Sequence, residues 1–299
     1  MKAVAPLLRH IVGLLRYTSE SDVVALHCNP RGLRARVAIV SAITCLFGKP
    51  LVVRVFGGES LQELARLGGS DRFIRTLRKV DLYLVETRRQ VQEARDKVAR
   101  VEWFPNHRRM PPAEHGRIEA DHPCRRFVFI GHVKATKGIL EIIEAGERFD
   151  GNVGIDVFGP FEDGMTEAVF DGLRRVHYRG VVEPDQVLDV LRQYDVLLLP
   201  TYYSGEGYPG IIIEAFSVGL PVITTRWRRL PELVDGHSGV LVEPRNPEAL
   251  YQAMKLLVDD PEQLARLRRG SLERRTAFDV AEWSDRFVEY CVKVASGHK

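Results

Sequence analysis

One stretch constrains the fold more than any other, because it contains a buried strand, a glycine-rich loop, a helix and a second strand in that order. Val196–Leu199 is a continuous apolar run, which is typical of a fully buried strand. A helix begins near Pro209, a residue suited to the first helical position, and ends at Gly219 before a strand resumes at Val222. In such a unit the loop lies at the carboxyl end of a parallel strand, where open α/β sheets bind ligands.

The loop and the helix that follows it have the chemistry of an anion and sugar site. The loop glycines let a ligand approach the backbone, and free amides at a helix start favour an anion such as phosphate. Glu206 lies in the loop and Glu214 on the helix, eight positions apart. One carboxylate can accept hydrogen bonds from sugar hydroxyls and the other from a ribose. A solvated helix face is the alternative for Glu214, although the apolar run 211–213 predicts a largely buried helix, in which a carboxylate needs partners.

Strands and helices alternate through the rest of the chain, which predicts an α/β protein with parallel sheets. In the first part we expect strands over 22–28, 51–58, 82–85 and 101–106, and helices over 5–17, 31–46, 70–80 and 90–98. In the second part we expect strands over 126–131, 153–158, 177–182, 195–200, 222–224 and 239–243. The helices expected there cover 138–148, 164–175, 184–193, 209–218, 247–258, 261–275 and 280–295.

Composition narrows the class of protein. With 45% hydrophobic and 28% charged residues, the chain of 299 residues is typical of a soluble globular protein. A net charge of +3, without a basic stripe that contains aromatic residues, does not favour nucleic acid as a partner. The four cysteines are scattered without metal-ligand spacing, which fits a reduced cytoplasmic setting. No run of 18 apolar residues predicts a membrane span.

At the Glu206–Glu214 spacing a family resemblance emerges. The segment resembles the Glu-x7-Glu signature of the retaining, nucleotide-sugar-dependent glycosyltransferases of family 4. The similarity continues in 131–138, 178–180 and 236–242, and covers about residues 100–260 well and about 20–100 loosely.

The resemblance implies the GT-B fold, in which two Rossmann-like domains with parallel sheets face each other across a cleft. The expected organisation is a shortened acceptor-side domain over 1–109, a linker over 110–122, a nucleotide-sugar-binding domain over 123–278 and a helix over 279–299 that crosses back to the first domain. The first domain looks truncated by about fifty residues or more, against a usual size of about 100–150 residues.

The resemblance also implies which residues bind the donor. Lys137 would bind the donor diphosphate, since a lysine at a helix start can neutralise phosphate as a point charge. Glu206 would contact the transferred sugar and Glu214 the ribose, so Glu206 and Lys137 are the expected catalytic residues. The expected substrate-binding residues are Gly131, His132, Lys134, Arg179, Gly180, Gly207, Tyr208, Pro209, Gly210 and Glu214. The alternatives without a role in donor binding are a solvent-facing lysine at 137 and a plain strand-end turn at 179–180.

Two departures from the family pattern affect the remaining candidates. The family usually has an arginine five residues before the lysine; here that residue is His132, so either Lys134 or a protonated His132 takes its place. The family often has a histidine after the second strand of the first domain, and this sequence has Phe56 and Gly57 there. Gly57 and Arg54 are the acceptor-side candidates. Arg54 interrupts an apolar strand, so it either faces the cleft or pairs with a structural carboxylate.

The sequence contains no Asp-x-Asp at a strand end and no cluster of His, Cys, Asp or Glu with metal-ligand spacing. We therefore expect no metal and no cofactor besides the donor substrate. Lys137 and the helix amides would stabilise the charge of the leaving diphosphate. Retention follows from the resemblance, and a front-side transfer needs no dedicated base.

These features favour a glycosyltransferase that uses a nucleotide sugar and a glycan or lipid-linked acceptor in cell-surface polysaccharide or glycolipid synthesis. A non-catalytic or half-catalytic subunit that binds the nucleotide sugar, and needs a partner chain for the acceptor side, is the main alternative. A nucleotide-sugar epimerase on the same fold is a third.

Basic N-terminal helices bear on the location of the protein. The helix over 5–17 has one apolar face, and a short helix carries Arg72, Arg75, Arg78 and Lys79. Phe73 and Ile74 beside them are expected to be exposed. This pattern favours a peripheral enzyme that binds an anionic membrane surface at the inner face; the alternative is a solvated basic face on a soluble cytoplasmic enzyme.

Overall fold

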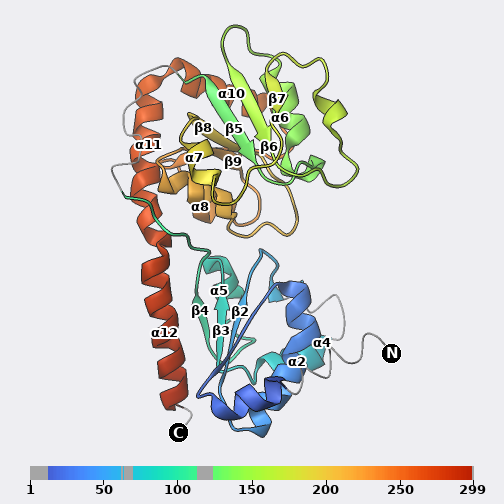
Figure 1. Cartoon of the computed structure of the whole chain (residues 1–299), viewed down its shortest axis with the longest axis vertical. Coiled ribbons are helices and arrows are strands. Elements are labelled where there is room, and N and C mark those ends of the chain that lie inside the picture. The colour runs from blue at the N-terminus through green and yellow to red at the C-terminus, as the bar shows by residue number, and fades with distance from the viewer. Residues whose placement is uncertain (1–12, 62, 64–69, 113–123, 298–299) are drawn as a thin grey trace. The chain divides into compact units, whose positions relative to one another are not determined.

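The computed structural model describes residues 13–61, 63, 70–112 and 124–297, and the chain in it divides into two compact units (Figure 1). The first unit comprises the residues up to 105 together with those from 281 onward, and the second comprises residues 106–280. The C-terminal helix therefore belongs to the first unit. The segment 106–109 lies in the second unit because Arg108 pairs there: its N–H donates to Phe278, and its carbonyl accepts from Val280. Most of the expected linker, from 113 on, lies outside the described residues.

The first unit is built on the four parallel strands that the sequence predicts, in the order β1-β2-β3-β4. The strands are β1 (Val24–Cys28), β2 (Leu51–Val55), β3 (Leu82–Val85) and β4 (Val101–Trp103). The helices are α2 (Pro30–Leu46), α4 (Ser70–Leu77), α5 (Arg88–Ala94) and α12 (Val280–Gly297). Of the expected helix over 5–17, residues 5–12 lie outside the description, and the described part is helical from 13 to 20.

Side chains along β2 alternate between two hydrophobic cores, as the pleat of a strand requires. Val53 and Val55 face the core that contains α2 and α4. Val52 faces the opposite core, where α12 contributes Trp283. Arg54 lies two positions from Val52 and so shares the α12 face of the strand. The C-terminal helix thus covers the side of this sheet that α2 and α4 leave open.

The second unit contains a six-stranded parallel sheet in the order β10-β9-β8-β5-β6-β7. Its strands are β5 (Arg126–Ile130), β6 (Gly154–Phe158), β7 (Val176–Tyr178), β8 (Val196–Leu199), β9 (Val222–Thr225) and β10 (Gly239–Val242). The chain moves outward from β5 to β7 and then returns to β8 on the other side of β5. The strand order reverses between β5 and β8, and open α/β sheets bind ligands outside the carboxyl ends of the strands at such a switch point.

Helices cover both faces of this sheet (Figure 1). They are α6 (Ile139–Gly146), α7 (Val187–Leu191), α8 (Gly210–Ser217), α9 (Leu230–Leu233), α10 (Pro247–Asp259) and α11 (Pro261–Arg275), with short 3-10 turns η2 (Ala135–Lys137), η3 (Glu167–Phe170) and η4 (Thr276–Phe278). Helix α6 packs on α10, and α8 packs on α11. The α/β class with two parallel sheets is confirmed.

Two local expectations are wrong, and one helix was missed. The helix expected over 164–175 is only the turn η3, because Gly164 and Gly172 adopt left-handed φ values of 79° and 74° that interrupt a helix on both sides. Helix α9 was not expected. Phe73 and Ile74 on α4 are partly buried and pack against the core, whereas the sequence suggested exposure.

Candidate functional site

Lys137 and Glu206 meet at the switch point of the second sheet. Lys137 ends η2, just after β5, and Glu206 lies in the loop after β8. The Lys137 Nζ and Glu206 Oε2 atoms are 2.6 Å apart, and the two side chains are only 14% and 8% exposed. The structure therefore brings together the two residues that the resemblance names as catalytic, as a largely buried ion pair.

A glycine lets the two loops approach. Gly138 has a left-handed φ of 84°, and a Cβ atom at this position would lie 2.4 Å from the carbonyl oxygen of Pro200 at the end of β8. The N–H of Tyr202 donates to the carbonyl of Thr136 at 2.8 Å, which joins the loops directly. Because the backbones touch, the side chains of the neighbouring residues 137 and 206 can bond.

The Glu206 carboxylate has a second partner within its own loop. The hydroxyl of fully buried Thr201 donates to Oε2 at 2.8 Å, the same oxygen that accepts from Lys137. Glu206 itself is 6% exposed, and a buried carboxylate is stable only when it is paired and hydrogen-bonded. We did not predict Thr201 from the sequence, although its position just after the buried strand could have suggested it.

Glu162, in the loop after β6, binds both of the other expected cations. Its Oε2 lies 2.8 Å from Lys134 Nζ, and its Oε1 lies 2.7 Å from His132 Nδ1. Burial lowers the pKa of Lys134, but the hydrogen bond and charge of Glu162 outweigh it and raise this pKa above its ordinary value. The hydrogen bond from Lys134 holds the pKa of Glu162 below its ordinary value.

Tyr203 connects Lys134 to the central pair. The centroid of its ring is 4.4 Å from Lys134 Nζ and 5.4 Å from Lys137 Nζ, so the ring face stabilises both cations. Lys134, Lys137, Glu162, Glu206 and Tyr203 thus form one cluster at the carboxyl edge of β5, β6 and β8. Sequence reasoning missed Glu162 and Tyr203, although both lie in loops that end at this edge.

The glycines that end β5, β6 and β7 bring their backbones into contact. A Cβ atom at Gly159, which has a φ of 136°, would lie 1.9 Å from the carbonyl oxygen of Gly131. The N–H of Gly159 donates to the carbonyl of Gly180 at 2.8 Å. The Arg179 side chain is half exposed and pairs with Asp156 at 2.7 Å. Gly159 was not identified from the sequence.

At the start of α8 the structure pairs Glu214 with Arg108. Arg108 Nε donates to Glu214 Oε1 at 2.6 Å, and the side chains are 36% and 22% exposed. A Cβ atom at Gly210 would lie 1.8 Å from Arg108 Nη2, so a larger residue there would displace this guanidinium. Arg108 is a further residue that the sequence did not reveal, because its partner lies 106 positions later in the chain.

The loop from Gly207 to Pro209 is held by its middle residue. Tyr208 is buried and its hydroxyl donates to Glu232 at 3.1 Å, so its ring packs inside the unit rather than at the loop surface. Its carbonyl accepts from Asn106 Nδ2 at 3.0 Å. The sequence suggested a turn-forming role for Asn106, and this bond adds an anchoring role. Tyr208 and its neighbours can therefore contact a ligand mainly through their backbone groups.

The two acceptor-side candidates lie in the first unit. Arg54 is 8% exposed and lies between two aromatic rings, with its Cζ 4.5 Å from the Phe56 centroid and 4.4 Å from the Phe104 centroid. Its Nη2 donates to the carbonyl of Pro105 at 3.3 Å. Burial lowers the pKa of Arg54 to about 10, against the opposing charge of Glu86.

Gly57, just after β2, is held by two residues that follow β3. Its N–H donates to Glu86 Oε2 at 3.1 Å, and its carbonyl accepts from Gln90 Nε2 at 2.8 Å. Glu86 is 3% exposed. The φ of Gly57 is 110°, which favours glycine, and a Cβ atom there would lie 2.9 Å from Glu59 Oε2. Glu86 and Gln90 were not identified from the sequence.

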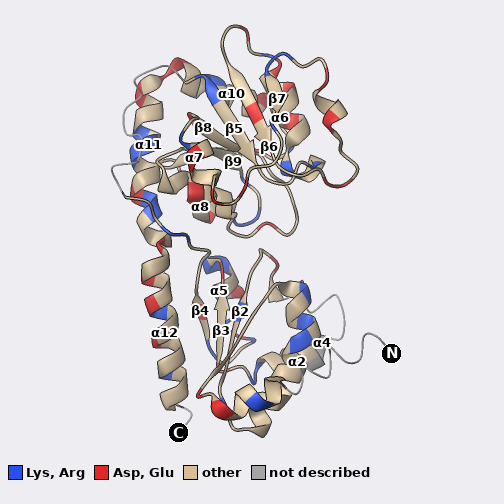
Figure 2. Ribbon diagram, viewed as in Figure 1, with Lys and Arg blue, Asp and Glu red and all other residues tan. Residues whose placement is uncertain are grey.

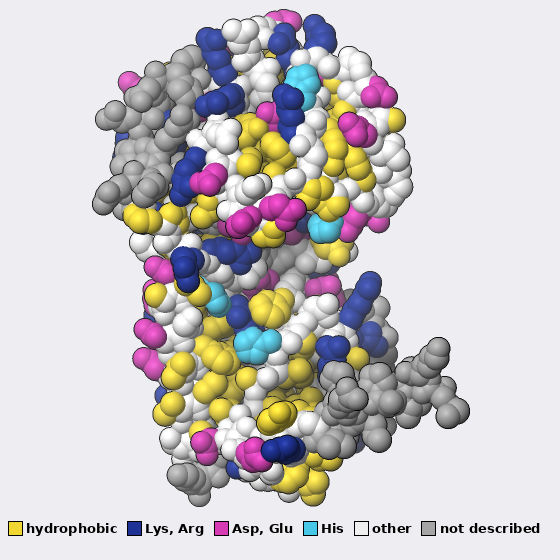
Figure 3. All heavy atoms as spheres, viewed as in Figure 1, with side chains coloured by type: hydrophobic (Ala, Val, Ile, Leu, Met, Phe, Trp, Pro, Cys, Tyr) yellow, Lys and Arg dark blue, Asp and Glu magenta, His cyan; other side chains and the backbone are white. Residues whose placement is uncertain are grey.

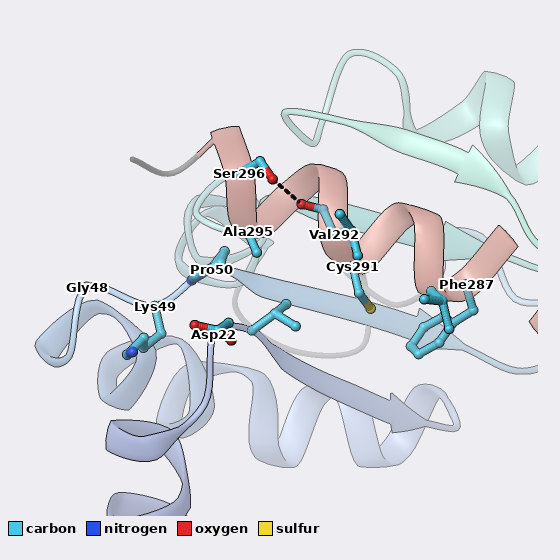
Figure 4. Close-up of a pocket in the computed structure, with 11 residues that line it drawn as sticks. Asp22, Gly48, Lys49, Pro50, Phe287, Cys291, Val292, Ala295 and Ser296 are labelled. Atoms are coloured by element: carbon cyan, nitrogen blue, oxygen red, sulfur yellow. Dashed lines mark hydrogen bonds between the residues drawn. The ribbon is translucent and has the colours of Figure 1, made fainter. Parts of the chain in front are cut away.

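A cavity of about 570 Å³ lies in the first unit at the opposite edge of its sheet, near the amino ends of β1 and β2 (Figure 4). Asp22 and Lys49 line it on the strand side, and Phe287 and Cys291 of α12 line it on the other. Val288 and Val292, which also line it, are 60% and 59% exposed, and Figure 3 shows hydrophobic side chains at the surface over α12. None of the expected site residues lines this cavity.

Within the described residues, no group of three or more His, Cys, Asp or Glu side chains could hold a metal ion. No helix in the part of the chain that the structure describes is both long and apolar enough to cross a membrane.

Most of the second unit matches a known protein family. Residues 124–260 match the family model described as glycosyl transferases group 1. The match covers less than half of the chain, and it shows that this segment is similar to the group 1 glycosyl transferases. The match contains Lys137, Glu206 and Glu214, so the resemblance of these motifs to group 1 glycosyl transferases is confirmed for residues 124–260.

Relatives of this chain include the D-rhamnosyltransferase WbpZ of Pseudomonas aeruginosa, which is 27% identical over 153 residues, covering 50% of this chain and 40% of the relative. The MMP alpha-(1->4)-mannosyltransferase of Mycolicibacterium hassiacum is 31% identical over 127 residues, covering 42% of this chain and 29% of the relative. The chain thus spans less than half the length of these curated relatives.

Solved structures show the same fold over nearly the whole chain. HepE of Anabaena, in complex with UDP, superposes with a TM-score of 0.76 at 15% identity, covering 95% of this chain and 82% of that one. The apo form of the lipopolysaccharide outer core galactosyltransferase WaaB superposes with a TM-score of 0.67 at 17% identity, covering 98% of this chain and 81% of that one. The GT-B fold expected from the resemblance is confirmed.

Proposed function

We propose that this chain is a retaining glycosyltransferase that moves a sugar from a nucleoside diphosphate sugar to a glycan or lipid-linked acceptor in cell-surface polysaccharide or glycolipid synthesis. The observation that carries the proposal is the 2.6 Å pair of Lys137 and Glu206 at the switch point of the second sheet. The printed descriptions of the relatives, a rhamnosyltransferase and a mannosyltransferase, support a hexose donor. HepE structures with UDP, and with UDP and glucose, support a nucleoside diphosphate as the carrier.

Charge decides how this pair would act. When the sugar leaves, negative charge grows on the departing diphosphate, and a fixed cation stabilises it most where water is excluded. Lys137 is 14% exposed and already fixed by Glu206, so it needs no reorganisation to meet that charge. Glu206 in turn can accept hydrogen bonds from the sugar hydroxyls, since a carboxylate has more acceptor sites than its two bonds to Lys137 and Thr201 use.

Retention and metal independence belong to the same proposal. In a front-side transfer the leaving phosphate oxygen takes the proton of the acceptor hydroxyl, and both groups lie on one face of the sugar. No separate base is then required. Lys137 and the backbone amides between Gly207 and Gly210 would stabilise the diphosphate, which is the work that a divalent cation does in other sugar transferases.

A donor screen tests the proposal. The purified chain is incubated with a panel of UDP-, GDP-, TDP- and ADP-sugars, with and without a lipid-linked or glycan acceptor, and the released nucleoside diphosphate is measured. We expect release from one class of donor, undiminished by EDTA, and an unchanged anomeric configuration in the product by NMR. Activity that EDTA abolishes and manganese restores would contradict the assignment of the leaving-group charge to Lys137. An inverted product would contradict retention.

A subunit that binds the nucleotide sugar but needs a partner chain is the second candidate. The observation that favours it is the site after β2, where Phe56 and Gly57 replace the histidine that the resemblance leads one to expect. In the same screen, a donor that raises the melting temperature without any release of nucleoside diphosphate would favour this candidate over the enzyme.

A further inference from the structure

The guanidinium of Arg108 is fixed from three sides at the start of α8. Its Nε donates to Glu214 Oε1 at 2.6 Å, and its Nη1 donates to the carbonyl of His107 at 3.0 Å. Its Nη2 lies so close to Gly210 that a Cβ atom there would come within 1.8 Å. Arg108 therefore touches two residues of the proposed donor site, one by an ion pair and one by packing.

Stability alone is a weak reason for this arrangement. The two side chains are 36% and 22% exposed, and ion pairs with that much exposure stabilise proteins little. The guanidinium also lies against the first residue of α8, where the positive end of the helix dipole disfavours a cation. An anion at the same place would be attracted by both the guanidinium and the helix end.

The other cations of the site pair with carboxylates other than Glu214. The position where the family usually has an arginine holds His132, and both His132 and Lys134 bind Glu162. Lys137 binds Glu206. Arg108 is the cation that lies at the loop where the resemblance puts the sugar and diphosphate, and its partner is the carboxylate expected to bind the ribose.

We infer that Arg108 is a donor-binding residue, which contacts the phosphate next to the ribose of a nucleoside diphosphate and compensates for the missing arginine at position 132. This inference rests on the proposed function. Glu214 takes only the Nε proton of the guanidinium, so the N–H groups on Nη2 can bind a phosphate oxygen, as a planar guanidinium does well. Glycine at position 210 leaves room for the guanidinium in this place, and a side chain there would displace it.

The experiment compares nucleoside diphosphates with nucleosides. UDP and GDP are titrated against the wild type by calorimetry, and uridine or guanosine by NMR. We expect Arg108→Ala to weaken binding of the nucleoside diphosphate roughly tenfold to hundredfold, the scale of a charged hydrogen bond, and binding of the nucleoside by less than about threefold. Arg108→Lys should recover only part of the loss. Arg109→Ala, an exposed neighbouring arginine, is the matched control and should bind like the wild type.

A double mutant tests the geometry independently. Gly210→Ala should weaken the diphosphate in the wild-type background and add little in the Arg108→Ala background, because contacting residues give non-additive effects. Melting temperatures check that each variant folds; if Arg108→Ala does not fold, Arg108→Lys and Gly210→Ala measure the same contact.

Unchanged affinity for the nucleoside diphosphate in the Arg108 variants would overturn the inference. An equal loss of affinity for the nucleoside would also overturn it, because Arg108 would then act only by positioning Glu214. A wild type that binds neither UDP nor GDP would instead overturn the proposed function, and the inference with it.

Discussion

The two units are built on the same kind of parallel sheet, yet they hold their internal cations differently. In the second unit Lys137 lies in a loop after a strand and pairs with a carboxylate, Glu206. In the first unit Arg54 lies within a strand, between the rings of Phe56 and Phe104. The cation in the loop, at the carboxyl edge of the sheet, can bind a ligand anion while it stays paired with its carboxylate. The cation within the strand packs between two rings, and its contacts are with the protein itself. The difference separates a site that can bind an anion from a residue that supports the fold.

The largest expected effect is on Glu206. Glu206→Gln should lower turnover by roughly a hundredfold, the scale of losing one preorganised polar group, while nucleoside diphosphate affinity changes much less. The reason is that this carboxylate would contact the moving sugar rather than the nucleotide. Steady-state kinetics and calorimetry with the product nucleotide give the two quantities. Glu243→Gln, an exposed carboxylate paired with Arg226, is the control and should change neither.

Equal losses of rate and nucleotide affinity in Glu206→Gln would place the carboxylate on the nucleotide. The second unit would then still differ from the first in binding an anion, but the catalytic role of the pair would have to be assigned to Lys137 alone.

Lys137→Ala should weaken binding of the nucleoside diphosphate by about 1.5–3 kcal/mol, because it removes a charged hydrogen-bond donor. It also leaves Glu206, 6% exposed, without its cation, so some loss of thermal stability is expected. Calorimetry on the folded variant is the measurement. Lys255→Ala on α10, an exposed lysine that pairs with Asp259, controls for the change in net charge. If Lys137→Ala binds the nucleoside diphosphate as tightly as the wild type does, Lys137 is not part of an anion site in the second unit.

Most of the fold could be predicted because the strands are apolar runs. The expected 82–85 is β3 as observed, and 195–200 differs from β8 only at its ends. The order of the strands could not be predicted, because nothing local shows that β8 returns beside β5. The failed helix over 164–175 has a local cause, since its glycines disfavour a helix more strongly than its apolar spacing favours one.

The candidate site could be predicted only as far as its motifs reach. Lys137 and Glu206 follow recognisable strands, and Glu214 lies on a recognisable helix. Their partners do not: Arg108 lies 106 positions from Glu214, and Glu162 lies 28 positions from Lys134, without any periodicity to connect them. A long-range ion pair is a property of the folded chain, and one sequence contains no signal for it.

Arg54→Leu tests whether the internal cation of the first unit supports the fold rather than donor binding. It should leave nucleoside diphosphate affinity unchanged and lower stability by about 1–2 kcal/mol, since it removes two cation–π contacts of a largely buried guanidinium. Thermal unfolding and calorimetry measure the two effects. Arg34→Leu on the exposed face of α2 is a control for the loss of charge in this unit. A loss of nucleotide affinity in Arg54→Leu would show that the first unit also contributes to the donor site.

The smallest effect per side chain is expected at the basic surface of the first unit. Arg75 on α4 and the following Arg78 and Lys79 are exposed, and Figure 2 shows Lys and Arg on α2 and α4. Because Phe73 and Ile74 pack inward, membrane binding here would depend on charge rather than on inserted side chains. The sequence also placed Arg72 in this basic group, but its side chain is not among those that the structure describes.

Anionic lipids attract a nearby Lys or Arg by about 1 kcal/mol each, so the three exposed residues together should give reversible binding that salt weakens. Sedimentation with anionic and neutral vesicles at low and moderate salt measures this, and replacing Arg75, Arg78 and Lys79 by Ser should reduce recovery with anionic vesicles. Three exposed cations of the second unit, Arg148, Arg174 and Lys255, replaced in the same way, provide the matched control. If both triple variants sediment alike, the first unit has no special affinity for membranes, and a water-soluble acceptor is favoured. If only the first triple variant loses binding, the two units divide the work, with the donor bound by the second and the membrane by the first.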